Sequence, residues 1–408
     1  MINETDTTHT QTNTWLTPGV KGIGAASLLA DIGHEIPTAL LPSLLTATLG
    51  APASALGIIE GVSDALAGIA RFAGGALADE PARRRTLAVG GYTATAVLSA
   101  AIAPVTATWQ LAILRAGAWT ARGIRVPARN ALLADVVPAD AYGRAYGFER
   151  AMDNLGAIGG PLAAIGLVAT VGTRSAIGLS VIPGLAAALA VIYAIRHTPK
   201  PTPQPRRALR FHIRPILTGP LRGLFTGIGA FEFGNCAATL LILRATQLLK
   251  PGHGQKTATT IALALYVTYN IAATITSLAA GRVSDRKGPT GVLTAGVAAF
   301  GLAYAGFTHD TSHWTILLPW FVLAGIGIGC VETAEHAAVA THAPTNIRGS
   351  AFGLLAATQS FGNLAASSIA GILWTAISPT WAFGYLTTAM IIAFIALRLT
   401  TGPAATSS

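Results

Sequence analysis

The motif Gly75-Ala-Leu-Ala-Asp79 occurs again 206 residues later as Gly281-Arg-Val-Ser-Asp285. A second motif, Gly143-Arg-Ala-Tyr-Gly147-Phe148, recurs at the same offset as Gly349-Ser-Ala-Phe-Gly353-Leu354. Because this offset is close to half of the 408-residue chain, the two pairs indicate a tandem duplication of one structural unit. In an apolar chain, two similar halves are typical of membrane transporters.

The composition places most of the chain in lipid. Hydrophobic residues make up 52% and charged residues only 11%, with a mean hydropathy of +0.55, whereas a soluble domain has about 25% charged residues. A spanning helix needs roughly 20 apolar residues. The expected spans are 21–47, 55–78, 86–105, 108–134, 143–169 and 174–195, then 221–247, 257–282, 290–308, 312–340, 349–376 and 379–399. We therefore predict an all-α membrane protein with twelve transmembrane helices in two six-helix halves, related by a pseudo-two-fold repeat.

Polar segments divide the chain. Residues 1–20 are polar and Thr-rich, without the pattern of a signal peptide, and are expected to form a disordered cytoplasmic tail. Residues 197–220 contain six prolines among basic residues, which predicts a linker between the halves 21–196 and 221–399. Residues 400–408 form the C-terminal tail.

The net charge of +10 suggests nucleic acid in a soluble protein, but here the basic residues lie in alternate loops. One run follows the second span at Arg83, Arg84 and Arg85, and others fill the corresponding loop of the second half and the linker. By the positive-inside rule these loops and both termini are cytoplasmic. We expect a multi-pass protein of a bacterial inner membrane that binds no nucleic acid.

The loop motifs and the repeated halves resemble the major facilitator superfamily over nearly the whole chain. That family carries G-x-x-x-D-R/K-x-G-R/K-R/K after its second and eighth spans, and the copy from Gly281 to Gly288 matches up to the last glycine. The first copy has Glu80-Pro-Ala before its basic run. The resemblance implies a latch, in which a carboxylate at a helix end holds an arginine of a neighbouring helix. The expected gating residues of these loops are Gly75, Asp79, Arg83, Gly281, Asp285 and Arg286. The alternative is that both aspartates are merely polar helix ends.

A third motif lies in span 143–169. Gly156-Ala-Ile-Gly-Gly160-Pro161 is similar to a motif associated with proton-coupled exporters of the family. Small residues four apart let another helix approach closely, and the proline bends the span. Close helix packing alone is the alternative reading.

Four arginines in span 108–134 share one helix face, because they are spaced by 7, 3 and 4 residues. They are Arg115, Arg122, Arg125 and Arg129. Each would cost roughly 2.5–3.5 kcal/mol at the centre of a lipid-facing helix, so they must face partners or water.

An antiparallel hairpin with the next span supplies two partners for these arginines. With a turn near Ala139, Arg129 falls opposite Glu149 and Arg125 opposite Asp153. We expect these two structural ion pairs, and Arg122 is left for function.

Span 21–47 holds the matching negative charge. Asp31 and Glu35 are four residues apart on one face, and His34 lies beside them. Two carboxylates so close in a low-dielectric medium favour the binding of a proton. Together with Arg122 these residues are the predicted proton-coupling relay. The alternative is a salt bridge to Arg122 that only joins two spans.

The intramembrane polar residues of the second half are sparser and suggest a substrate-reading surface. The substrate-cavity candidates are Arg115, Glu232, Asn235, Tyr266, Asn270, Glu332, Glu335, His336 and Gln359. No spacing among them defines a metal site, so neither metal nor cofactor is expected.

These patterns favour a secondary transporter that exports a small organic molecule by alternating access, driven by protons. The open alternative is a proton-coupled uptake symporter for an anionic metabolite held by Arg122 or Arg115. An enzyme is not expected, because the spans lack a Ser/His/Asp or metal spacing, and a sensor lacks a soluble domain. The expected partners are a small-molecule substrate, protons and the lipid bilayer, with the protein acting as a monomer.

Overall fold

The computed structural model describes residues 15–198, 213–218 and 221–401, and the described elements are all helical. The helices of the first half are α1 (Pro18–Ser43), continued by a π-helical turn (Leu44–Thr48), α2 (Ala53–Leu77), α3 (Pro81–Ala100), α4 (Thr108–Asp135), α5 (Tyr142–Val171), α6 (Thr173–Leu179) and α7 (Val181–Arg196). The others are α8 (Ile213–Thr218), α9 (Leu221–Glu232), α10 (Ala238–Lys287), α11 (Pro289–Phe307), α12 (Trp314–His342), α13 (Arg348–Ala376) and α14 (Pro379–Thr401).

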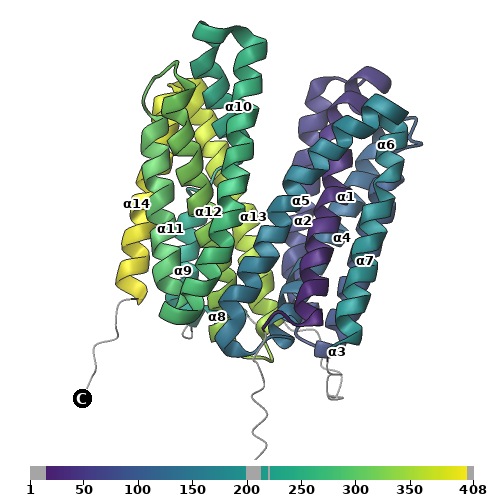
Figure 1. Cartoon of the computed structure of the whole chain (residues 1–408), viewed down its shortest axis with the longest axis vertical. Coiled ribbons are helices and arrows are strands. Elements are labelled where there is room, and N and C mark those ends of the chain that lie inside the picture. The colour runs from purple at the N-terminus through teal and green to yellow at the C-terminus, as the bar shows by residue number, and fades with distance from the viewer. Residues whose placement is uncertain (1–14, 199–212, 219–220, 402–408) are drawn as a thin grey trace, which may run out of the picture.

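Two helical bundles lie side by side (Figure 1). Helices α1 to α7 form one bundle and α9 to α14 the other, which are the two halves predicted from the 206-residue offset. The halves meet along two seams, where α5 packs against α10 and α2 packs against α13. Hydrophobic side chains still face outward along the helices, among them Ile165 (69% exposed) and Ile372 (66%), as expected for a surface that contacts lipid.

Six helical segments of the described chain are long and apolar enough to cross a membrane by length and composition. They include the segments that contain α5, α10 and α12. Helices such as α1 and α4 are also long, but charged residues lower their mean hydropathy, including the buried Asp31 in α1 and the four arginines of α4, of which Arg122 is partly exposed. Such charges are tolerated in a membrane where they face the bundle interior.

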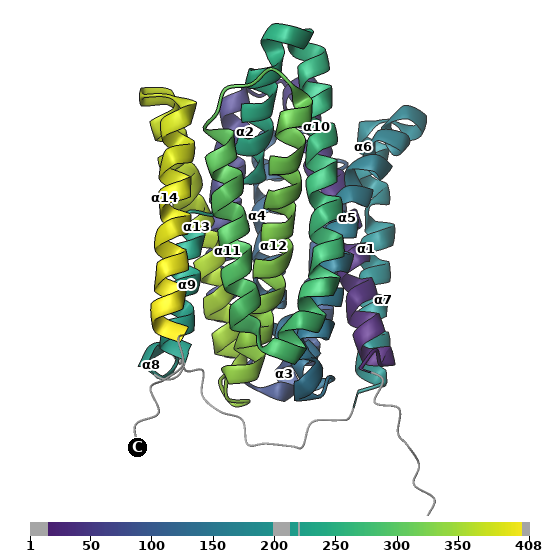
Figure 2. The same ribbon diagram turned by 60° about the vertical axis from the view of Figure 1, so that its left-hand side comes forward.

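Two expected spans are not single straight helices. Span 174–195 consists of α6 and α7, which meet at Ser180. Span 221–247 is interrupted at residues 233–237, between α9 and α10. The range of α10 contains two helical segments that run in opposite directions (Figure 2), because Gly254, in the predicted loop between spans 221–247 and 257–282, has a non-helical φ of 72° and turns the chain back. A left-handed φ of this kind favours glycine, and Figure 2 shows the resulting turn at the top of α10.

Two segments predicted as a tail and a linker contain helical residues. Helix α1 begins at Pro18, inside the expected tail, with the Thr17 hydroxyl accepting from the Val20 amide at 3.3 Å. The short helix α8 lies within the expected linker. The remaining parts of the predicted tails and linker, 1–14, 199–212, 219–220 and 402–408, lie outside the described residues.

Candidate functional site

The two repeated motifs meet each other across the seams. On one seam Gly281 of α10 crosses Gly143 of α5 so closely that a side chain at either position would overlap the other backbone. On the other seam a Cβ added to Gly75 of α2 would lie 2.6 Å from the Cα of Gly353 in α13. Only glycine allows such close approach of two helix backbones. We call the end of the molecule where these crossings lie the closed end.

Each motif carboxylate binds the first turn of a helix in the opposite half. Asp285 accepts hydrogen bonds from the backbone amides of Gly143 (2.6 Å) and Arg144 (3.1 Å) and from the Arg144 Nε (2.7 Å). Asp79 accepts from the Ser350 amide (2.7 Å) and from the Ser350 hydroxyl. The unpaired amides and positive dipole of a helix N-terminus favour a carboxylate there.

The expected latch therefore differs between the two seams. Asp285 holds an arginine, as the motif implies, whereas Asp79 holds a serine and the start of α13. Arg83 does not bridge the halves: its Nε pairs with Glu80 at 2.7 Å, and its side chain is 39% exposed. Arg286 is exposed to the surroundings.

The buried arginine of the first basic run is Arg84, which the sequence did not single out. Arg84 donates to both oxygens of Asp135 (2.8 and 2.7 Å) and to the Thr345 carbonyl of the other half (3.2 Å). Arg348 of α13 lies 3.7 Å from the same aspartate. Asp135 thus holds together α3, α4 and α13 at the closed end.

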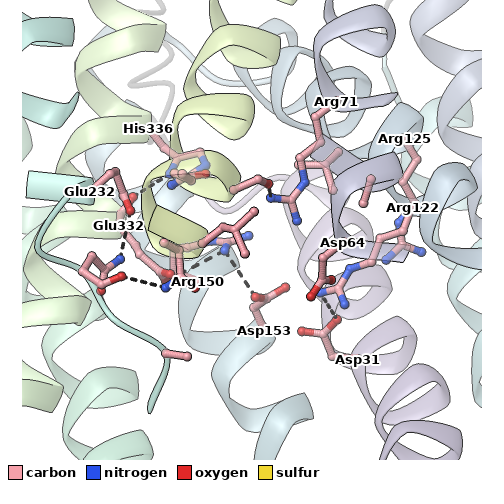
Figure 3. Close-up of a pocket in the computed structure, with 18 of the residues that line it drawn as sticks. Asp31, Asp64, Arg71, Arg122, Arg125, Arg150, Asp153, Glu232, Glu332 and His336 are labelled. Atoms are coloured by element: carbon pink, nitrogen blue, oxygen red, sulfur yellow. Dashed lines mark hydrogen bonds and ion pairs between the residues drawn. The ribbon is translucent and has the colours of Figure 1, made fainter. Parts of the chain in front are cut away.

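A cavity of about 510 Å³ lies between the halves, beyond the closed end. Figure 3 shows charged residues from both halves around it. From the first half it is lined by Asp31, Asp64, Ala67, Arg71, Arg122, Arg125, Val126, Arg129, Arg150 and Asp153. From the second half it is lined by Glu232, Asn235, Ala237, Glu332, His336, Gln359, Ser360, Asn363, Leu364 and Ser367.

The predicted relay residues lie together on one side of the cavity. Arg122 donates to Asp31 at 3.4 Å and contacts the Nε2 of His34. Glu35 Oε1 lies 3.2 Å from the same His34 nitrogen. Asp31 and Arg122 line the cavity, whereas His34 is 4% exposed and lies behind them. The guanidinium of Arg122 thus separates the imidazole from the cavity.

The glycines of the third motif pack directly on this cluster. A Cβ at Gly156 would lie 2.7 Å from the Asp31 Cβ, and one at Gly160 would overlap the Glu35 Cβ. Pro161 follows within the same helix α5. The small residues therefore bring the backbone of α5 against the aliphatic part of the Asp31 and Glu35 side chains, which ties the motif to the cluster.

The pair of Arg129 with Glu149 is present, with Nη1 and Oε1 2.7 Å apart. Glu149 is fully buried and also accepts from the Ser27 hydroxyl (2.6 Å) and from Arg150 (2.7 and 2.9 Å). The sequence reading missed Arg150, although it directly follows Glu149. A buried carboxylate with three donor side chains joins α1, α4 and α5.

The predicted pair of Arg125 with Asp153 is wrong. Arg125 lies 3.9 Å above the ring of Tyr92 in α3 and is 3% exposed. Asp153 instead lies 3.2 Å from Arg150 and 3.7 Å from Arg129. Helix α4 packs along α2 and α3 and meets α5 only briefly, so the assumed hairpin contact does not extend as far as Arg125.

The break between α9 and α10 places polar groups in the cavity wall. Asn235 donates to Glu232 at 3.0 Å, and its own carbonyl accepts from Asn363 at 2.8 Å. The Ala237 amide donates to Ser367 at 2.8 Å. Side chains of α13 thus satisfy the backbone groups that the break frees, which is the condition for irregular backbone inside a membrane.

The other second-half candidates divide between the cavity wall and the layer behind it. Glu332, His336 and Gln359 line the cavity. Glu335 is fully buried behind Gln359, which donates to it. Figure 3 shows Arg150 between Glu332 and Asp153, at 3.9 and 3.2 Å.

Three cavity candidates lie elsewhere. Arg115 is 1% exposed and pairs with Glu60 at 3.0 Å, so it forms a structural ion pair outside the cavity wall. Tyr266 stacks on the Tyr269 ring, and Asn270 donates to the Tyr266 carbonyl at 2.9 Å. Neither is among the residues that line the cavity.

Arg71 and Asp64 of α2 line the cavity, although the sequence analysis named neither of them as a cavity candidate. They are seven residues apart and therefore on one face. Two charged residues on one face of a membrane span are a pattern from which their place in the cavity could have been predicted. Among the described residues, no group of three or more His, Cys, Asp or Glu side chains is arranged to hold a metal ion.

Comparisons with known proteins agree with this architecture. The model of the Major Facilitator Superfamily matches residues 23–263 and 253–408. An uncharacterised MFS-type transporter of Methanocaldococcus jannaschii is 28% identical over 390 residues, covering 94% of each chain.

Two solved structures share the fold at low sequence identity. A bacterial homologue of the iron transporter ferroportin in an outward-facing state has a TM-score of 0.76 at 13% identity, covering 94% of this chain and 99% of that one. The human organic anion transporter MFSD10 has a TM-score of 0.74 at 17% identity, covering 93% and 99%. With two repeated six-helix halves and a family match along almost its whole length, this chain belongs to the major facilitator superfamily of membrane transporters.

Proposed function

We propose that this chain is a proton-driven exporter of a small organic molecule, and that Asp31, His34, Glu35 and Arg122 couple proton binding to transport. The observation that carries this proposal is the packing of Gly156 and Gly160 on Asp31 and Glu35. The motif that resembles those of proton-coupled exporters thereby packs on the two acidic residues that would bind the proton. The protein acts as a monomer in a bacterial inner membrane.

The direction of the cavity follows from the position of the contacts between the halves. In the part of the chain that the structure describes, the hydrogen bonds and ion pairs between the halves lie either at the closed end or at Arg71 and Arg150, which line the cavity. Farther along α2, Ile58 is 67% exposed and Val62 is 52% exposed. If the basic loops are cytoplasmic, the closed end faces the cytoplasm and the cavity opens outward.

In this outward-open state, a proton from outside would neutralise Asp31 or Glu35 and weaken the hold on Arg122. Arg122 could then move toward the cavity and displace the substrate. Closure of the outer side and release of the proton inside would reset the cluster for the next substrate. Alternating access of this kind needs a ligand with different affinity for the two states, and the proton supplies that difference.

We expect Asp31→Asn to uncouple transport from the proton gradient. A panel of fluorescent organic compounds is followed in proteoliposomes with an imposed pH gradient. Gradient-driven accumulation should fall about 5- to 150-fold, the range given by a coupling free energy of about 1–3 kcal/mol, while exchange of substrate without a gradient persists. Asp140→Asn, which changes an exposed aspartate outside the cavity, is the matched control.

Two outcomes would count against the exporter. Unchanged gradient dependence in Asp31→Asn removes the proposed role of the cluster. If substrate moves in the same direction as protons, export in exchange for protons is rejected and proton-coupled symport is supported.

A second candidate function, uptake of an anion together with protons, is favoured by Arg71. Its Nη1 donates to the Ala356 carbonyl at 3.3 Å and to the Ser360 hydroxyl, both neutral acceptors in the other half. No carboxylate within the described residues lies within 4.0 Å of Arg71, although it lines the cavity and is partly exposed. A carboxylate on a substrate could supply the missing counter-charge.

The Arg71→Gln variant tests whether Arg71 holds an anionic substrate. If the substrate is an anion, wild-type protein should be stabilised against heating by benzoate but not by benzamide, and Arg71→Gln should weaken benzoate binding by about tenfold or more, because a hydrogen bond to a charged group contributes about 1.5–3 kcal/mol. Thermal unfolding over a concentration series measures the affinity. Equal stabilisation by benzoate and benzamide would reject the anion candidate.

A further inference from the structure

The charged residues that line the cavity between the halves are divided by sign. Among the described lining residues, the first half contributes five arginines and three aspartates, whereas the second half contributes two glutamates and neither lysine nor arginine. Figure 3 shows Glu232 and Glu332 across the cavity from Arg122 and Arg125. One wall is therefore rich in guanidinium groups, and the opposite wall carries carboxylates.

Most of these charges already have a partner of opposite sign. Arg129 and Arg150 both lie 2.7 Å from Glu149, behind the cavity wall. Arg150 also lies 3.9 Å from Glu332, so one of the two glutamates of the second half has a cation nearby. The contact with the coupling cluster accounts for Arg122. The charges that remain show what a bound molecule would have to supply.

Two arginines of the first-half wall lack an acidic partner. In the described part of the chain, no carboxylate lies within 4.0 Å of Arg71 or Arg125, and the Nε of each is buried without a hydrogen-bond partner. Arg125 is 3% exposed and lies against the ring of Tyr92. A buried guanidinium without a counter-charge is costly, so these two residues indicate a site for an anionic group.

Glu232 is the acid of the second-half wall that lacks a cation. It is 2% exposed, and no Lys, Arg or His side chain of the described residues lies within 4.0 Å of its carboxylate. Its hydrogen-bond donor is the neutral amide of Asn235 at 3.0 Å, in the break between α9 and α10. A carboxylate buried this deeply needs a cation or a proton. An ammonium group on a bound molecule would supply the cation.

We propose that the transported molecule is a zwitterion, whose anionic group binds at Arg71 and Arg125 and whose ammonium group binds at Glu232. This substrate class rests on the proposed transport of a small organic molecule, and on neither its direction nor its proton coupling. The cavity of about 510 Å³ has the size of a small-molecule site. Because opposite halves bind the two charges, a zwitterion would favour a state in which the halves are closer together, whereas a singly charged compound would not.

Thermal unfolding of the wild-type protein with a matched set of compounds at neutral pH tests this class. The zwitterions are para-(aminomethyl)benzoate, γ-aminobutyrate and ε-aminocaproate, which separate their two charges by different lengths. The compound para-methylbenzoate keeps only the carboxylate, and benzylamine keeps only the ammonium group. We expect at least one zwitterion to bind about tenfold or more tightly than both singly charged compounds, because each of these loses one set of hydrogen bonds to a charged group. Absence of stabilisation by all three zwitterions, or equal binding of a singly charged compound, would overturn the proposal.

Glu232→Gln tests the site of the ammonium group. This variant keeps an acceptor for Asn235 and removes the charge, so zwitterion binding should weaken by about tenfold or more while para-methylbenzoate binds as before. Asp64→Asn removes a carboxylate from the first-half wall instead and should not weaken zwitterion binding. Asp310→Asn changes an exposed aspartate of the second half and is the control for a change of charge alone.

Two results with these variants would contradict the assignment of Glu232. If Glu232→Gln binds the zwitterion as tightly as the wild type, Glu232 serves a proton and not an ammonium group. If Asp64→Asn loses as much affinity as Glu232→Gln, the ammonium group lies against the first half.

The substrate class and the proposed function can fail separately. Zwitterion binding to a protein whose transport ignores protons would reject proton-driven export and support the substrate class. Proton-driven transport of other compounds, without zwitterion binding, would reject the substrate class and support the export.

Discussion

Glu149→Leu is expected to destabilise the protein by about 3–5 kcal/mol, because it leaves two buried guanidiniums without their shared carboxylate. Glu149 is fully buried and lies 2.7 Å from both Arg129 and Arg150. Asp153 is the remaining acid near both arginines, at 3.7 and 3.2 Å. Typical stabilities of folded proteins are about 5–15 kcal/mol, so a large part of the folded population should be lost.

Thermal unfolding of the detergent-solubilised protein measures this effect, together with the yield of monodisperse material. Glu80→Gln is the matched control, because its pair with Arg83 is partly exposed and exposed pairs contribute about 0–1 kcal/mol. Glu149→Gln, which keeps the side-chain shape and hydrogen-bonding capacity, should lie between the two. If Glu149→Leu and Glu80→Gln unfold at the same temperature, the buried network does not stabilise the fold.

Gly147→Leu should abolish transport while leaving each half folded. A Cβ at this position would overlap the Ser277 carbonyl and lie 3.2 Å from the Gly281 Cα, so both obstacles are backbone atoms of α10. Overpacking of this kind costs about 1–3 kcal/mol or more. This cost applies only to the conformation in which α5 and α10 cross at the closed end. The equilibrium between this conformation and the one in which that end is open should therefore move about 5- to 150-fold toward the open one.

Spin labels on α5 and α10 at the closed end would report this shift as a longer distance between the helices. Gly166→Leu is the control on the same helix, because a Cβ there meets nothing within 4 Å. It should transport like the wild type. An unchanged label distance in Gly147→Leu would mean that α10 yields to the larger side chain and that the crossing does not control the closed state.

The sequence predicted the halves well, because duplication leaves a pattern that needs no knowledge of contacts. The glycine motifs were visible as repeats, and the structure adds that each packs against the other motif of the opposite half. The hairpin register placed Arg129 near Glu149, and the matching of buried charges placed Arg122 near Asp31. Both pairs are present in the structure.

Spacing failed where the neighbouring helix was assumed wrongly. The spacing shows which face of α4 carries Arg125. It does not show that α3 covers this face and places Tyr92 against the arginine. The break after Glu232 was missed for a related reason, since the side chains that satisfy it come from α13, more than a hundred residues away. Arg71 was not expected in the cavity, because its neutral acceptors Ala356 and Ser360 come from the other half and only the three-dimensional packing brings them close.

The use of backbone amides by Asp79 and Asp285 has a consequence for how the two halves could diverge. Every residue except proline offers a main-chain N–H, so the receiving positions on α5 and α13 were free to change after the ancestral gene doubled. Position 144 is now arginine and its counterpart at 350 is serine, yet both helices still present amides to an aspartate. Selection need preserve only the acid and the small residues at the crossings. A comparison of sequences would therefore identify the aspartate of each contact but not the residues whose backbone amides bind it.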